Sequence, residues 1–282
     1  MINFLHSSWV CMLSLLLFSG YVLSYADGIP PEGIIKTPYS STSFLPGDSL
    51  CPAGDVLLTT QAAVDSLASR YPQCQILDGS LRIFGADIQD LSPLSGLRHI
   101  GGSLVIEANP NLYHLNGLDS LRSVAGDLII QGNAVLNDFW GLNQLETVGG
   151  NFTFLGNDGL SRLGEFDNLR SVGAQVDISY NAALRTIETF GNLQQVNSLS
   201  IQSNYALVNI GGIDGAFDKI SSLVGSITLV NNPALMDIRM LAKLKSVGDD
   251  LVLFNLDRLI DLKNLSQLQT VGGDLYIGQM MS

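Results

Sequence analysis

A short apolar motif recurs about every 24 residues, and this repeat is the strongest constraint on how the chain folds. Each copy begins with a small or polar residue and continues with alternating apolar side chains, as in Gly102–Ile106 and Gly126–Ile130. The copies begin at Gly79, Gly102, Gly126, Gly150, Ala174, Asn197, Gly225, Asp249 and Gly273. Self-similarity at a fixed short period is typical of stacked coils. The sequence therefore predicts a mainly β, right-handed single-strand solenoid of about nine coils over residues 79–282.

The alternation within each motif predicts one strand per coil, with side chains such as Leu104 and Ile106 pointing inward. An asparagine follows the second to the eighth of these strands, whereas Ala86 stands at this place after the first. Stacked asparagines at one corner can bind the backbone of the neighbouring coil and satisfy its buried polar groups. The predicted ladder consists of Asn109, Asn133, Asn157, Asn181, Asn204, Asn232 and Asn255.

The remainder of each coil carries an apolar residue at every third position, such as Leu112, Leu115 and Leu118. Glycines at the coil ends disfavour long helices, so short turns or 3₁₀ segments are expected. One spacing between motifs, from Asn197 to Gly225, is longer than all the others. It predicts an insertion around residues 210–222, on the side away from the strands.

The part of the chain that precedes Gly79 is expected to form three segments. An uncharged apolar run, Trp9–Phe18, precedes Ser24-Tyr25-Ala26 and indicates a signal peptide over residues 1–26. The alternative is a membrane anchor, but the run is shorter than the roughly 20 residues that span a bilayer; we expect no transmembrane segment in the mature chain. Residues 27–50 are rich in Pro, Gly and Ser and predict an extended linker.

Residues 51–78 are expected to form a cap over the first coil. Thr60 is placed to begin a helix that ends near Tyr71-Pro72. Signal cleavage leaves Cys51 and Cys74, and two cysteines in an exported chain most often pair. A helix and disulfide at this place would cover the apolar end of a solenoid.

Charge and motif content exclude several classes of function. The net charge of −12 makes nucleic acid and anionic membrane surfaces improbable partners, because both require a basic patch. The sequence contains no metal-binding, phosphate-binding or nucleophile motif. Neither His99 nor His114 has a catalytic partner at a recognisable spacing. We therefore expect no enzyme activity, no catalytic residue, no cofactor and no metal.

The outward positions of the predicted strands form the candidate binding face. They show apolar residues toward both ends and polar residues in the middle. The same residues also suit strands for reasons unrelated to binding. The candidate residues are Phe84, Val105, Glu107, Ile129, Gln131, Leu155, Val230, Val252, Phe254 and Tyr276.

The segments Cys74–Ile83 and Leu91–Ile106 closely resemble the receptor L-domain family, the β-helical ligand-binding modules of insulin-receptor and EGF-receptor ectodomains. Cys51-Pro-Ala-Gly and Tyr71-Pro-Gln-Cys look most like secreted bacterial members. The resemblance covers about residues 51–282, and its nine coils exceed those of one receptor L domain. It implies a leucine-rich, non-enzymatic fold with no catalytic residues.

The sequence thus predicts a secreted or cell-surface module for adhesion or ligand recognition, with a protein or glycan ligand. The alternatives are a structural cell-envelope protein and a carbohydrate-active β-helix enzyme. The second alternative needs paired carboxylates on the surface, whereas outward acids such as Glu107 and Asp177 are scattered. The motif repeat stops within the ninth coil, so we expect either a truncated C-terminal end or stacking on a partner.

Overall fold

The computed structural model describes residues 50–211 and 215–278. The expected signal peptide and all but the last residue of the linker lie outside this range. So do three residues of the predicted insertion and the last four residues of the chain.

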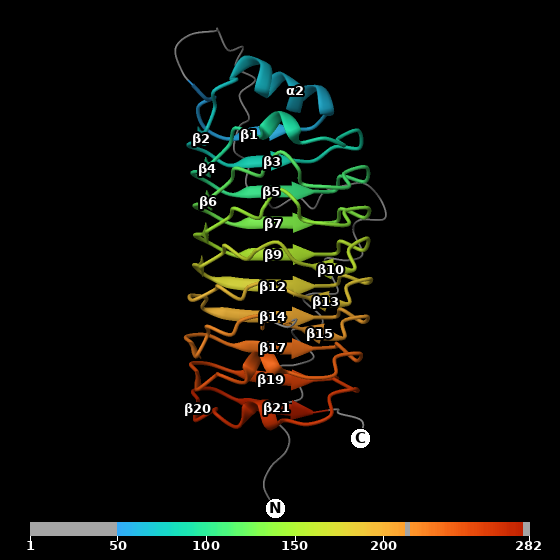
Figure 1. Ribbon diagram of the computed structural model, residues 1–282, viewed down its shortest axis with the longest axis vertical. Coiled ribbons are helices and arrows are strands. Elements are labelled where there is room, and N and C mark those ends of the chain that lie inside the picture. The colour runs from blue at the N-terminus through green and yellow to red at the C-terminus, as the bar shows by residue number, and fades with distance from the viewer. Residues whose placement is uncertain (1–49, 212–214, 279–282) are drawn as a thin grey trace, which may run out of the picture. The chain divides into compact units, whose positions relative to one another are not determined.

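The fold is the predicted parallel β-solenoid of about nine turns. Its front is one parallel sheet of ten strands that follow each other in chain order, one per coil (Figure 1). The strands are β1 (Val56–Leu58), β3 (Leu81–Ile83), β5 (Leu104–Glu107), β7 (Leu128–Gln131), β9 (Phe152–Leu155), β12 (Gln175–Ser179), β14 (Ser198–Gln202), β17 (Ile227–Val230), β19 (Leu251–Phe254) and β21 (Leu275–Gly278).

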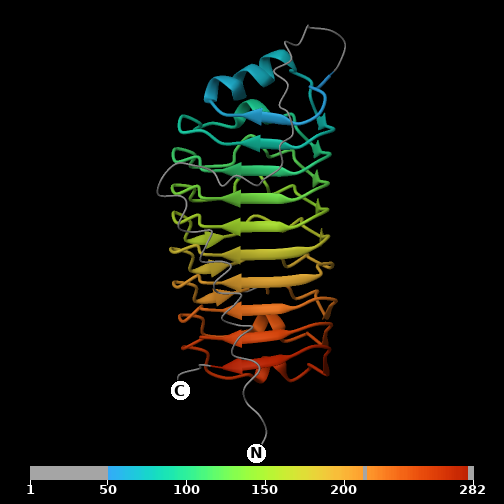
Figure 2. The same ribbon diagram turned by 180° about the vertical axis from the view of Figure 1, so that it is seen from behind.

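Three smaller parallel sheets form further sides of the coils. One contains β2 (Ile76–Leu77), β4 (His99–Ile100), β6 (Ser123–Val124), β8 (Thr147–Val148) and β11 (Ser171–Val172). The second contains β10 (Arg162–Leu163), β13 (Thr186–Ile187) and β15 (Asn209–Ile210), which stack beside one another in Figures 1 and 2. The third contains β16 (Ser222–Leu223), β18 (Ser246–Val247) and β20 (Thr270–Val271).

The inward side chains of the ten-stranded sheet form one continuous core along the solenoid. Leu104 and Ile106 are fully buried, as their alternation predicts. Phenylalanines fill the middle coils: the Phe166 ring lies 4.9 Å from that of Phe152 and 5.8 Å from that of Phe190 between centroids. Because each coil packs only on its neighbours, this core lengthens with every added coil.

Six asparagines form a buried ladder at the corner that follows the ten-stranded sheet. The side-chain oxygen of Asn157 accepts hydrogen bonds from the backbone and side-chain nitrogens of Asn133, both at 3.1 Å. The side-chain nitrogen of Asn157 in turn donates to the carbonyl of Ile130 at 2.9 Å. The same pattern recurs along Asn109, Asn133, Asn157, Asn181, Asn204 and Asn232. Each asparagine therefore satisfies backbone groups that the tight corner would otherwise leave unpaired.

The prediction for Asn255 is wrong, because Leu256 occupies the ladder position in that coil and is fully buried. Asn255 lies one residue earlier, where φ is +53°, and its side chain donates to Asn231 at 2.9 Å. Asn231 has the same left-handed backbone, which asparagine tolerates better than most residues. Asn255 therefore serves the turn and not the ladder.

The N-terminal cap contains the predicted helix, α2 (Gln61–Arg70). The Thr60 hydroxyl caps it by accepting from the backbone N–H of Ala63 at 3.1 Å. The side chain of Gln61 binds the loop of the next coil, donating to the carbonyl of Asp90 at 2.8 Å. The disulfide Cys51–Cys74 is present, as predicted. The cap also contributes β1, so the sheet begins one strand earlier than the repeat motif.

The expected short 3₁₀ segments occur as η2 (Ser92–Leu94), η3 (Arg239–Leu241) and η4 (Lys263–Leu265). The longest coil, here called the long coil, joins β14 to β17, where Ser200 pairs with Thr228. This pairing continues the register of the sheet without interruption. The extra residues are therefore accommodated outside the ten-stranded sheet.

Candidate functional site

The candidate binding face is the outward surface of the ten-stranded sheet, here called the sheet face. Parallel pairing places its side chains in columns along the solenoid. Val105 pairs with Ile129, and Glu107 pairs with Gln131. Gln131 then pairs with Leu155 on the next strand. The columns expected from the sequence are thus present in the register of the sheet.

A polar network lies at the N-terminal end of the sheet face. Glu107 forms an ion pair with Arg82 and accepts a hydrogen bond from the Gln131 amide at 2.6 Å. The guanidinium of Arg82 also lies over the Phe84 ring, 5.2 Å from its centroid. Glu107 is therefore only 7% exposed, although the sequence indicated an outward, accessible acid. Its charge is neutralised by neighbours, which reduces its availability to a ligand.

An apolar strip lies beside this network. Val105 and Ile129 are neighbours in one column, and Leu155 lies in the adjacent column. All three side chains are half-buried by their neighbours on the sheet. The strip thus presents branched apolar side chains to solvent. The hydrogen bonds of the ten-stranded sheet hold the backbone beneath them in place.

Asp177 lies at the centre of the sheet face. It pairs with Thr153 on one side and Ser200 on the other, so no acidic residue adjoins it in the neighbouring strands. Burial raises the pKa of the Asp177 carboxyl above its ordinary value, and hydrogen bonds from Ser179 and Ser200 partly offset that rise. The middle of the face is therefore polar but only weakly charged.

The C-terminal end of the sheet face is apolar and aromatic. Val230 pairs with Phe254, and Val252 pairs with Tyr276. The rings of Phe254 and Tyr276 lie 5.7 Å apart between centroids, and Tyr276 is 42% exposed. The C-terminal end and the middle of the sheet face thus differ in polarity.

Groups that could support catalysis or bind a metal are sparse in residues 50–211 and 215–278. This part of the chain contains no group of three or more His, Cys, Asp or Glu side chains placed to hold a metal ion. His99 contacts the Ser123 hydroxyl at 2.7 Å, and His114 contacts the Asp138 carboxylate at 2.7 Å. No helix among the described residues has the length and apolar character needed to cross a membrane.

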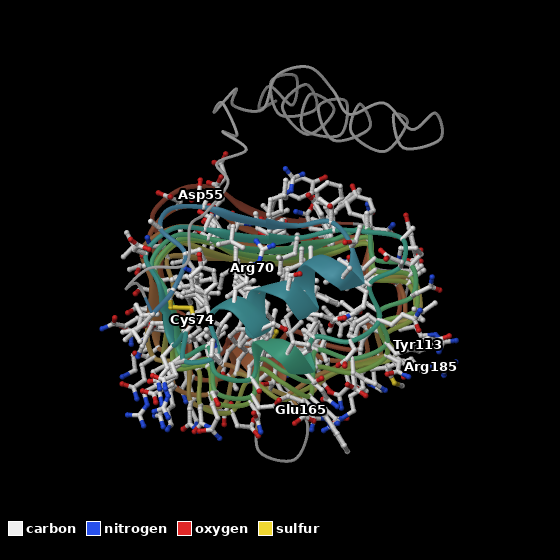
Figure 3. The ribbon with its side chains drawn as sticks, turned by 90° about the horizontal axis from the view of Figure 1, so that it is seen from above. Asp55, Arg70, Cys74, Tyr113, Glu165 and Arg185 are labelled. Carbon is white, nitrogen blue, oxygen red and sulfur yellow. A yellow bond between two sulfur atoms is a disulfide. The ribbon has the colours of Figure 1, made fainter. Side chains whose placement is uncertain are left out.

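Sequence reasoning missed a groove of about 470 Å³ on the turn-rich side of the coils. It is lined in part by Trp140, which is 61% exposed, and by Glu165. Figure 3 shows Glu165 on the side opposite Asp55, the residue that precedes β1. The signal in the sequence was the column Gly117, Gly141, Glu165, in which a glutamate replaces glycine at the equivalent position of the next repeat.

Part of the repeat matches one known family. Residues 73–137 match the family model of the receptor L domain. The resemblance noted in the sequence is thereby confirmed over this segment. A search of curated proteins and a search of solved structures gave no match.

The matched receptor L-domain segment contains β3, β5 and β7, and so the N-terminal part of the sheet face. The receptor L domain is a non-enzymatic, ligand-binding fold of extracellular proteins. The later coils continue the register of the matched ones through β21. The disulfide of the cap agrees with an extracellular setting.

Proposed function

We propose that this chain is a secreted or cell-surface module that captures a protein ligand on its sheet face, in adhesion or ligand recognition. The observation that carries the proposal is the apolar strip of Val105, Ile129 and Leu155, beside the compensated Arg82–Glu107 pair. The strip lies partly within the matched receptor L-domain segment. Partly exposed apolar groups on a rigid surface, bordered by polar groups, are typical of a protein interface.

The extent of the sheet face, with ten strands, favours a protein over a small molecule. Parallel strands hold the outward side chains in fixed columns, so a large partner surface can contact several columns together. The aromatic end, with Phe254 and Tyr276, supplies the residue types that dominate binding energy at protein interfaces. The net charge of −12 favours a partner with a basic surface and faster association at low ionic strength.

The test is a binding screen of the purified full chain against arrays of extracellular proteins and of glycans. For each protein that binds, the double variant Ile129→Glu with Leu155→Glu is expected to weaken binding at least about a hundredfold, because two charges would be buried at the interface. Circular dichroism should be unchanged, since both side chains point outward.

The matched control is Ile260→Glu, the same substitution at an apolar residue that is 79% exposed and lies outside the sheet. It should leave binding unchanged. Equal binding by the double variant would overturn the proposal. Such a result would favour the structural cell-envelope role, for which the outer side chains of the sheet need not contact a ligand.

A further inference from the structure

The groove on the turn-rich side crosses four successive coils. Its lining runs from Ser92 in η2, through Asn116 and Trp140 in the next two coils, to Glu165. Neighbouring coils in a parallel sheet are separated by about 4.8 Å, so the groove extends roughly 15 Å along the solenoid. This length suits a short chain of linked rings better than a single small molecule.

The indole of Trp140 is the apolar surface of the groove. Its backbone N–H donates to the Asp138 carboxylate at 3.3 Å, and that carboxylate contacts His114 at 2.7 Å. The loop is therefore held in place while the ring remains exposed. An aromatic ring carries a negative face that attracts weakly positive C–H groups. The apolar face of a pyranose ring presents such C–H groups.

The polar lining of the groove matches sugar hydroxyls. Asn116 and Asn143 are exposed, and within residues 50–211 and 215–278 neither side-chain amide takes part in a hydrogen bond. Each amide can donate and accept, as a hydroxyl also can. Asp119 and Glu165 add acceptor oxygens. Two carboxylates and a strongly negative chain disfavour an acidic ligand.

Glu165, which lines the groove, has a backbone conformation that glutamate disfavours. Its φ is +73°, in the left-handed region, where the two preceding coils have Gly117 and Gly141. Glutamate is strained in this region, and such strain tends to occur at functional sites. Arg162 forms an ion pair with Glu165 at 3.7 Å, a distance too long for a hydrogen bond, because its Nε donates to Glu188 at 2.6 Å. The Glu165 carboxylate thus remains available to a ligand.

We propose that this groove binds an uncharged oligosaccharide, with a sugar ring stacked on Trp140 and hydroxyls bonded to Asn116, Asn143 and the two carboxylates. The site is separate from the sheet face. The two proposals therefore stand or fall independently, and a module with both sites would connect a protein partner to a glycan.

Tryptophan fluorescence tests the groove directly. The chain has two tryptophans, Trp9 and Trp140, so a full chain with Trp9→Phe reports on Trp140 alone. The probes are cello-, xylo- and N-acetylchito-oligosaccharides, with an oligogalacturonate of equal length as the charged comparison. At least one uncharged probe is expected to change the emission saturably and to protect Trp140 from acrylamide quenching. The oligogalacturonate should do neither.

Variants then test the contacts by calorimetry. Trp140→Ala and Asn143→Asp should each weaken binding about tenfold or more, through loss of stacking and of an amide donor respectively. Tyr205→Ala is the matched control, because Tyr205 is 59% exposed and lies outside the groove. It should bind normally, as should the sheet-face double variant. Absence of a response to every uncharged probe, or equal affinity of Trp140→Ala and Tyr205→Ala, would overturn the proposal.

Discussion

The middle coils and the N-terminal cap bury the apolar core of the solenoid by different means. In the middle, Asn157 lies between the equivalent asparagines of the neighbouring coils, and Phe166 packs against Phe139 of the preceding coil and Phe190 of the next. At the N-terminus, Ala86 replaces the ladder asparagine, and a helix with a disulfide covers the end of the core. A repeated coil is therefore stabilised by its copies, whereas a terminal coil needs a sequence of its own. The following predictions test this difference.

The largest effect is expected in the middle. Phe166→Ala should lower the free energy of unfolding by about 4 kcal/mol, because the vacated space lies within a cluster of buried phenylalanine rings. Urea denaturation followed by circular dichroism measures this loss. Phe84→Ala, the same change on the outward face, should cost about 1 kcal/mol. Equal losses would show that the middle coils do not depend on their internal packing.

Removal of a ladder asparagine should have the next largest effect. Asn157→Ala should cost between about 3 and 4 kcal/mol, because the backbone N–H of Asn133 and the carbonyl of Ile130 lose buried partners. The control is Asn255→Ala, which removes the bond to Asn231 outside the ladder and should cost about 1 kcal/mol. The same denaturation experiment compares them, and an Asn255→Ala loss as large as that of Asn157→Ala would contradict the ladder argument.

The cap should respond locally. Replacing Cys51 and Cys74 by serine should cost about 3 kcal/mol, since the disulfide closes a loop with a sequence separation of 23 residues. Hydrogen exchange should accelerate in β1 and α2 and remain slow in β12, because coils interact only with their neighbours. Uniform acceleration along the chain would instead indicate that cap and middle coils unfold together.

The smallest effect should have the opposite sign. Burial raises the pKa of Asp177 in the folded chain, so the folded state binds more protons than the unfolded state between the ordinary value of 3.8 and the raised value. Stability contributed by this group is thus present at low pH and is lost as pH rises through that window. Asp177→Asn should therefore stabilise the chain at pH 7 and leave it unchanged below the window. Denaturation at both pH values measures the difference.

The coils were predictable from the sequence because their signal repeats. The alternating motif indicated the strands and their register, and Thr60 marked the beginning of the helix. By contrast, β1 lacks the motif, and only its pairing with β3 defines it. Asn255 was misassigned by residue type, although the spacing already set it apart: it lies six residues after Asp249, whereas each ladder asparagine lies seven residues after the start of its motif.

Properties of the surface were harder to predict than the fold. Glu107 is outward by periodicity, yet two neighbours from adjacent strands cover it. The groove around Trp140 combines loops of four coils whose shapes depend on individual φ angles, such as that of Glu165. Periodicity assigns a residue to a side of the coil, whereas the path of each loop decides what it contacts.

The long coil between β14 and β17 has a consequence for how such proteins diversify. Its additional residues leave the pairing of Ser200 with Thr228 in register, so the front of the solenoid is unaffected by a change of length behind it. Mutation and selection can therefore vary the loops of one side while the sheet face on the other side stays unchanged.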